Sequence, residues 1–254
     1  MNRKLICLAA GFAALICSGQ MTRAGVVLLD SGVGGHAAAG ASYVNFDSLS
    51  IDNQNVGVAE NTAGNGYITA TFTPNADTAT GTTTSYAAPY LSGDNNLHFG
   101  ADPNSTYTGP DSTQYLTSGS NDGVPTGASI VLTFSSGSQS YFGMLWGSVD
   151  DYNTLTFLND GQVVTSFTGT QIIASQYYGN QQQNGTVYVN FNSDVPFDEV
   201  KIQSSQLAFE FDNVAYSGLT ADPQLTIAPE PASVATWGML GVCIAGWTWQ
   251  RKKK

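Results

Sequence analysis

The sequence predicts an all-β protein, built as a two-sheet antiparallel sandwich of the jelly-roll type. Between residues 25 and 225, short apolar runs alternate with polar residues at the two-residue period of a half-buried strand. Clusters of Gly, Asn, Asp, Ser and Thr separate the runs, and no stretch here has the period of an amphipathic helix. A closed barrel is the alternative topology, and the lack of a fixed repeat argues against a solenoid.

The first half of this interval predicts few strands and long connections. The expected strands are 26–29, 43–46 and 67–73. Pro74 ends the third of them, because proline cannot continue a strand ladder. The Thr-rich stretch 75–85 is expected to be a loop, and 97–99 a short strand. A long loop is expected over 101–123, with a short strand at 114–117.

The second half is more regular. The expected strands are 130–134, 141–146, 154–158, 162–167, 187–191, 200–202 and 207–211. Asn159-Asp160-Gly161 predicts a tight hairpin between 154–158 and 162–167, because Gly161 can adopt a positive φ.

Charge is distributed very unevenly along the chain. All 19 acidic residues, but only one basic residue (Lys201), lie between Gly25 and Glu230, so this body carries −18 against −11 for the whole chain. Such a body repels phosphate backbones, and nucleic acid is therefore excluded as a partner. The three cysteines, Cys7, Cys17 and Cys243, all lie outside the body, which excludes thiolate metal sites and cysteine nucleophiles within it.

The N-terminal stretch, residues 1–24, has the pattern of a signal peptide. Arg3 and Lys4 precede an apolar run over 5–18, which is short for a membrane span. Small residues then predict cleavage between Ala24 and Gly25. The body that follows, 25–225, is therefore expected outside the cytoplasm.

The C-terminal stretch, residues 226–254, combines three features in a fixed order. Pro229-Glu230-Pro231 comes first, and an uncharged apolar run over 232–249 follows it. As a helix these residues span about 27 Å, close to the ~30 Å core of a bilayer. The tail then acts as a cytoplasmic stop through four basic residues, Arg251, Lys252, Lys253 and Lys254.

This order of motif, helix and basic tail resembles the PEP-CTERM sorting signal of bacterial exosortase-dependent surface proteins. Two body segments, 141–157 and 209–216, also look like a cyanobacterial and proteobacterial subgroup of these proteins, in which a Gly-x-x-Trp-Gly-Ser strand precedes a Tyr-Asn-x-Leu hairpin. The resemblance implies transient anchorage in the inner membrane and processing near Pro229-Glu230-Pro231 by an exosortase, a membrane peptidase with a cysteine nucleophile. It also implies a non-enzymatic, structural or adhesive role at the cell surface or in an extracellular matrix, within an exopolysaccharide-rich biofilm envelope.

The residues themselves also argue against an enzyme. His36 lies in a Gly/Ala loop, His98 has no triad pattern around it, and no Gly-x-Ser-x-Gly elbow is present. Glu210 alternates with Phe209 and Phe211, which predicts a solvated sheet face rather than acid–base chemistry. A secreted hydrolase is therefore the least favoured interpretation.

Calcium is the candidate cofactor, because Ca²⁺ takes oxygen ligands from loops. The candidate ligands are Asp94, Asp150, Asp151 and Asp212. None of them lies in an EF-hand pattern, and the same residue types also form turns, so both interpretations stay open.

An alternative function is that of a carbohydrate-binding module, which requires exposed aromatic rings beside polar groups. Trp146 with Tyr152 is one candidate pair, and Tyr177 with Tyr178 in a Gln/Asn-rich segment is the other. The apolar residues around Trp146 favour a core position for it, whereas Tyr177 and Tyr178 are better placed for exposure.

Overall fold

The computed structural model describes residues 25–49, 56–60, 66–96, 98–99, 107–119 and 127–221. The expected signal peptide (1–24) and sorting segment (226–254) lie outside these residues. Within the described ranges, no helix is both long and apolar enough to cross a membrane.

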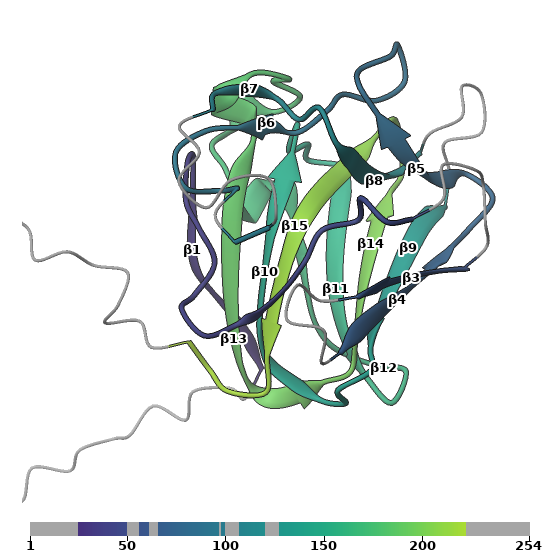
Figure 1. Ribbon diagram of the computed structural model, residues 1–254, viewed down its shortest axis with the longest axis vertical. Coiled ribbons are helices and arrows are strands. Elements are labelled where there is room, and N and C mark those ends of the chain that lie inside the picture. Colours follow the sequence, from purple (N-terminus) through teal and green to yellow (C-terminus); the bar gives the residue numbers. More distant parts are fainter. Residues whose placement is uncertain are drawn as a thin grey trace, which may run out of the picture.

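Two antiparallel sheets face each other across one core, as the sequence predicts (Figure 1). The first sheet has the order β1-β13-β10-β15-β8-β5, with β2 also paired to β15. Its strands are β1 (Val26–Gly32), β2 (Ser42–Val44), β5 (Ala76–Thr80), β8 (Gln114–Ser118), β10 (Gln139–Gly147), β13 (Val187–Phe197) and β15 (Phe209–Ser217).

The second sheet has the order β12-β11-β14-β9-β4-β3. Its strands are β3 (Val56–Glu60), β4 (Tyr67–Phe72), β9 (Ala128–Phe134), β11 (Asn153–Asn159), β12 (Gln162–Thr168) and β14 (Glu199–Ser204). A small ribbon pairs β6 (Tyr90–Leu91) with β7 (Gly109–Pro110). The helical turns among the described residues are η1 (Gly169–Gln171), η2 (Ser175–Tyr177) and η3 (Gln183–Gly185).

The second sheet has one buried and one solvated face, which the alternating sequence predicts. In β4, Ile68, Ala70 and Phe72 are buried, while Tyr67 and Thr71, which point to the other face, are exposed. The same alternation continues in β9, β11 and β14. The predicted hairpin is also confirmed, since Asn159 pairs with Gln162 and both residues of the two-residue loop have positive φ.

The first sheet, by contrast, is buried on both faces. Eight of the nine residues of β15 are buried, and so are eight of nine in β10. Since neighbouring side chains point to opposite faces, a second layer must cover the outer face. The chain after β1 crosses in front of β10 and β15 (Figure 1). Four apolar side chains of the covering segments pack there: Ala37, Ala41, Leu91 and Phe99.

This covering layer overturns the solvated position predicted for Glu210. Its side chain is 1% exposed, because residues near Ala87 lie over the outer face of β15. The prediction was wrong because alternation with Phe209 and Phe211 fixes only the face on which Glu210 lies. It does not reveal whether distant residues cover that face.

Two further expectations about the first half need correction. Residues 76–80 of the expected Thr-rich loop form β5, paired with β8 from Ala76–Ser118 to Thr80–Gln114. This strand has no large apolar side chain, so its pairing comes from β8 and not from a hydrophobic pattern. Residues 98–99 form a turn and a bend, not the expected strand.

The centre of the core is an aromatic cluster around Phe157. Its fully buried ring makes edge contacts with four rings from both sheets, at centroid distances of 5.0 to 6.1 Å. These rings are Phe142, Phe167, Phe191 and Phe197. Edge-to-face packing of this kind adds to the free energy gained by burying the rings.

We expect Phe157→Ala to lower the free energy of unfolding by about 3–5 kcal/mol, because it leaves a cavity that rigid neighbours cannot fill. Val163→Ala is the matched control, since Val163 is 65% exposed on the partner strand β12 and its loss should change stability by less than about 0.5 kcal/mol. Urea unfolding of both variants measures the difference. Equal effects would contradict the central position of Phe157.

Candidate functional site

Trp146 is a core residue and is not available to a ligand. Its ring is fully buried and stacks on Phe209 at a centroid distance of 4.3 Å and an interplanar angle of 13°. Tyr152 is also committed within the fold, because its hydroxyl lies 2.7 Å from Asp150 Oδ2 and 2.6 Å from the Leu207 carbonyl. The first candidate pair for sugar binding is therefore ruled out.

The four predicted calcium ligands do not come together. Asp94 and Asp151 are exposed, whereas Asp150 and Asp212 are buried and belong to separate groups of contacts. Among the described residues, no group of three or more His, Cys, Asp or Glu side chains is arranged to hold a metal ion. Sequence spacing could not show this, since the four carboxylates come from three different segments.

One of the four predicted ligands, Asp212, is a fully buried carboxyl group whose negative charge needs a proton or a cation to offset it. It is 1% exposed, and the groups that act on its carboxyl oxygens are the neighbouring Asn213 backbone and the Asp111 carboxyl group. Burial, together with the nearby carboxylate of Asp111, raises the pKa of Asp212 well above its usual value. Asp111 is itself buried, and its Oδ1 accepts hydrogen bonds from the amide and hydroxyl of Thr113.

Asp111, rather than Asp94, Asp150 or Asp151, is the carboxyl group that lies beside Asp212. Two buried carboxyl groups side by side need a shared proton or a bound cation, because two negative charges in a low-dielectric interior repel each other. A Ca²⁺ ion at this place would have Asp111 and Asp212 as ligands, in place of Asp94, Asp150 and Asp151. The sequence gives no signal for Asp111, because it lies about 100 residues before Asp212 in a stretch without strand periodicity.

Glu210 is a second buried carboxyl group on the same face of β15. Its Oε1 accepts the Ala87 amide at 2.8 Å, and its Oε2 accepts the Ser148 hydroxyl at 2.6 Å. Burial raises the pKa of Glu210 to about 7, and the hydrogen bonds from Ser148 and Ala87 offset part of that rise. Glu210 therefore ties the covering layer to the sheet, and it lines neither of the pockets described below.

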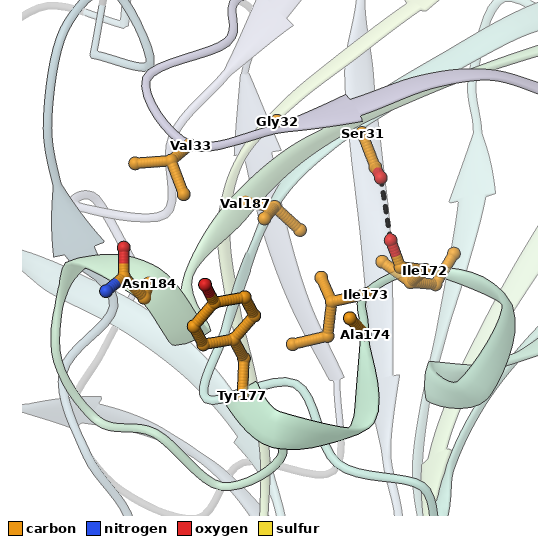
Figure 2. A pocket seen from close by; sticks show the side chains of 9 residues that line it. All are labelled: Ser31, Gly32, Val33, Ile172, Ile173, Ala174, Tyr177, Asn184 and Val187. Atoms are coloured by element: carbon orange, nitrogen blue, oxygen red, sulfur yellow. Dashed lines mark hydrogen bonds between the residues drawn. The ribbon is translucent and has the colours of Figure 1, made fainter.

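A pocket of about 350 Å³ opens at the edge of the first sheet (Figure 2). It lies where the end of β1 meets the start of β13 and the connection between β12 and β13. The lining residues are Ser31, Gly32, Val33, Ile172, Ile173, Ala174, Tyr177, Asn184 and Val187. Tyr177 is 36% exposed, so the structure places this predicted residue at the surface, while Tyr178 beside it is half-buried.

The pocket has an apolar floor and polar groups on one wall. Ile173 and Val187 lie across its base, and the ring of Tyr177 stands beside Asn184 (Figure 2). Ser31 Oγ donates a 2.7 Å hydrogen bond to the Ile172 carbonyl, which fastens the β12–β13 connection to β1. The Gln/Asn-rich composition of 176–184 was the only sequence signal for Asn184.

A smaller pocket of about 190 Å³ lies under the segment after β1. It is lined by His36, Ala37, Ala39, Tyr43 and His98. The imidazole of His98 stacks on the Tyr43 ring at 5.2 Å, so the two histidines of the chain line one pocket although 62 positions separate them. Both histidines are exposed, as expected of loop residues.

Comparisons with family models, curated proteins and solved structures found no match to this chain.

We expect millimolar Ca²⁺, but not Mg²⁺, to raise the melting temperature of the protein by roughly 5 to 10 °C in a high NaCl background. A site at a hundredfold excess of ligand over Kd stabilises by about 2.7 kcal/mol, and a domain of this size shifts by about 2–4 °C per kcal/mol. Asp212→Asn should abolish the shift, whereas Asp94→Asn should keep it because Asp94 is exposed and is not among the carboxyl groups that act on Asp212. Equal small shifts with both metals would leave only screening of the −18 charge.

We expect Glu210→Gln to stabilise the protein at pH 8 and to have little effect near pH 4.5. The folded state binds the Glu210 proton more tightly than the unfolded chain, because its pKa is about 7 against a usual 4.5. The stability that protonated Glu210 contributes is therefore complete below about pH 4.5. It is lost as the pH rises to about 7, by about 3 kcal/mol in all, because the buried group must then ionise. Thermal unfolding in EDTA across this range measures the effect, and the same shift at both pH values would contradict it.

Proposed function

We propose that this protein is exported and acts without enzymatic activity at the cell surface or in the extracellular matrix, after processing by an exosortase. One observation carries the proposal: the order of Pro229-Glu230-Pro231, the uncharged run 232–249 and the basic tail 251–254. The prolines keep the backbone extended next to the membrane, where a peptidase can bind it. The apolar run and basic tail would hold the precursor in the inner membrane.

The arrangement of the two ends of the described body is compatible with two membrane segments in the precursor. Ala221 exchanges two 2.8 Å hydrogen bonds with the side chain of Asn192, and Asn192 pairs with Val27 at the start of β1. The chain therefore enters and leaves the body at the same place. Both the signal peptide and the sorting segment can then attach at one end of the sandwich.

The expected signal cleavage also has a favourable environment. The Gly25 nitrogen lies 2.5 Å from Asp194 Oδ1. Cleavage between Ala24 and Gly25 would convert this amide nitrogen into an ammonium group beside a carboxylate. A charge-assisted hydrogen bond of this kind is stronger than the neutral one that it replaces.

A structural or adhesive role suits the body better than catalysis. Neither described pocket is lined by a carboxylate, and Glu210, whose pKa is near 7, is sealed beneath the covering layer. We propose a jelly-roll-like sandwich that contacts extracellular polysaccharide in a biofilm envelope. The alternative, a dedicated carbohydrate-binding module, is favoured by one observation, which is the exposed Tyr177 in its pocket.

We expect replacement of Pro229, Glu230 and Pro231 by Ala to leave an uncleaved precursor in the inner membrane of a host that contains an exosortase. The control is Pro223→Ala, which changes a proline outside the motif and should be processed normally. Membrane fractionation and intact mass of the product measure the result. Release of the triple variant with the mass of the processed wild type would refute the proposal.

A further inference from the structure

The pocket beside Tyr177 lies in a part of the chain that carries no charge. From Gly161 to Ser193 the sequence contains no Asp, Glu, Lys, Arg or His, although the body as a whole carries 19 acidic residues. No lining residue of the pocket is charged. The connection that contributes Tyr177 and Asn184 is instead rich in amides, and most of them are exposed: Gln176, Asn180, Gln181, Gln182, Gln183 and Asn184.

The wall of the pocket offers an aromatic face beside free polar groups. The Tyr177 hydroxyl points across the pocket on the side of Asn184 (Figure 2). Among the hydrogen bonds between described residues, none involves the Tyr177 hydroxyl or the Asn184 side-chain amide. An aromatic ring with uncommitted hydroxyl and amide groups, above an apolar floor, matches a ring that has apolar C–H faces and polar hydroxyl edges.

The connection that carries Tyr177 is held in place before any ligand binds. The Gly179 amide donates to the Val149 carbonyl at 3.1 Å, and the Val149 amide donates to the Gly185 carbonyl at 2.9 Å. Gly185 packs so closely that a Cβ there would lie 1.7 Å from the Asn180 carbonyl oxygen. A braced backbone loses little conformational entropy on binding, which is a condition for useful affinity in a shallow pocket.

We propose that the pocket formed by Tyr177, Asn184, Ile173 and Val187 binds a sugar unit of an uncharged polysaccharide. Its volume of about 350 Å³ is at the lower end of the range for small-ligand pockets, which suits one or two sugar rings. The net charge of −18 repels uronic-acid polymers, and the single body lysine, Lys201, lies on β14 of the other sheet. Such binding rests on the adhesive role proposed above, and it supplies that role with a binding site and a class of ligand.

The test is binding of the purified full-length protein in mild detergent to soluble polysaccharides. The uncharged probes are dextran, laminarin and galactomannan, and the charged probes are alginate and polygalacturonate. Titration calorimetry at low and at high NaCl shows whether any preference depends on charge. Binding in solution does not require sorting, so the triple variant at 229–231 should bind as the wild type does, and failure of either proposal is distinguishable from failure of the other.

We expect saturable binding to at least one uncharged probe, and a loss of at least about tenfold in affinity in Tyr177→Ala. Tyr177→Phe, which keeps the ring and removes the hydroxyl, should fall between Tyr177→Ala and the wild type. The matched control is Tyr67→Ala, because Tyr67 is 45% exposed on β4 of the other sheet, and its affinity should stay within about twofold.

Three outcomes would overturn the inference. These are no binding of any uncharged probe by the folded protein, equal losses in Tyr177→Ala and Tyr67→Ala, or a preference for alginate or polygalacturonate. Circular dichroism of each variant establishes that it is folded. Asn184→Ala tests the polar wall of the pocket independently of Tyr177. An unchanged affinity in both Asn184→Ala and Tyr177→Phe would contradict sugar binding through these polar groups.

Discussion

The structure depends on the burial of the first sheet between two layers. Strands β10, β13 and β15 pack large apolar rings against the second sheet, while their outer faces lie under the segments that follow β1 and β5. The outer face is held by hydrogen bonds. Tyr141 donates to Asn190 at 2.6 Å, Asn190 donates to Asp30 at 2.7 Å, and the Ala38 amide donates to Tyr141 at 2.8 Å. Satisfied polar groups of this kind fix a cover layer that has little apolar surface of its own.

The same cover creates the unusual electrostatics of the body. A single lysine cannot pair with many carboxylates, so the buried ones must be neutralised in another way. Glu210 meets this need with two hydrogen-bond donors and a raised pKa. Asp212 lies beside the Asp111 carboxyl group, and burial raises its pKa well above its usual value, so a proton or a cation offsets its charge. The acidic body thus keeps its most perturbed carboxyl groups inside, away from the pockets at its surface.

The pocket beside Tyr177, by contrast, is lined by uncharged residues. It lies at the edge of the first sheet, between the end of β1, the start of β13 and a connection that contains three short helical turns and no charge. Backbone hydrogen bonds to Val149 join this connection to the end of β10, next to the residues that hold Glu210. The sandwich therefore combines a rigid frame with an uncharged pocket at the edge of the first sheet.

The sequence by itself determined the all-β class, the alternating strands of the second sheet and the hairpin at Asn159-Asp160-Gly161, because these depend on local periodicity and turn chemistry. It also indicated the surface position of Tyr177 and the core position of Trp146. Only the tertiary structure decided that β5 is a strand, that Glu210 is buried, and that Asp111 and not Asp94 lies beside Asp212. Each of these depends on contacts between residues far apart in the chain, and no local pattern of side chains encodes which segment will cover a sheet face.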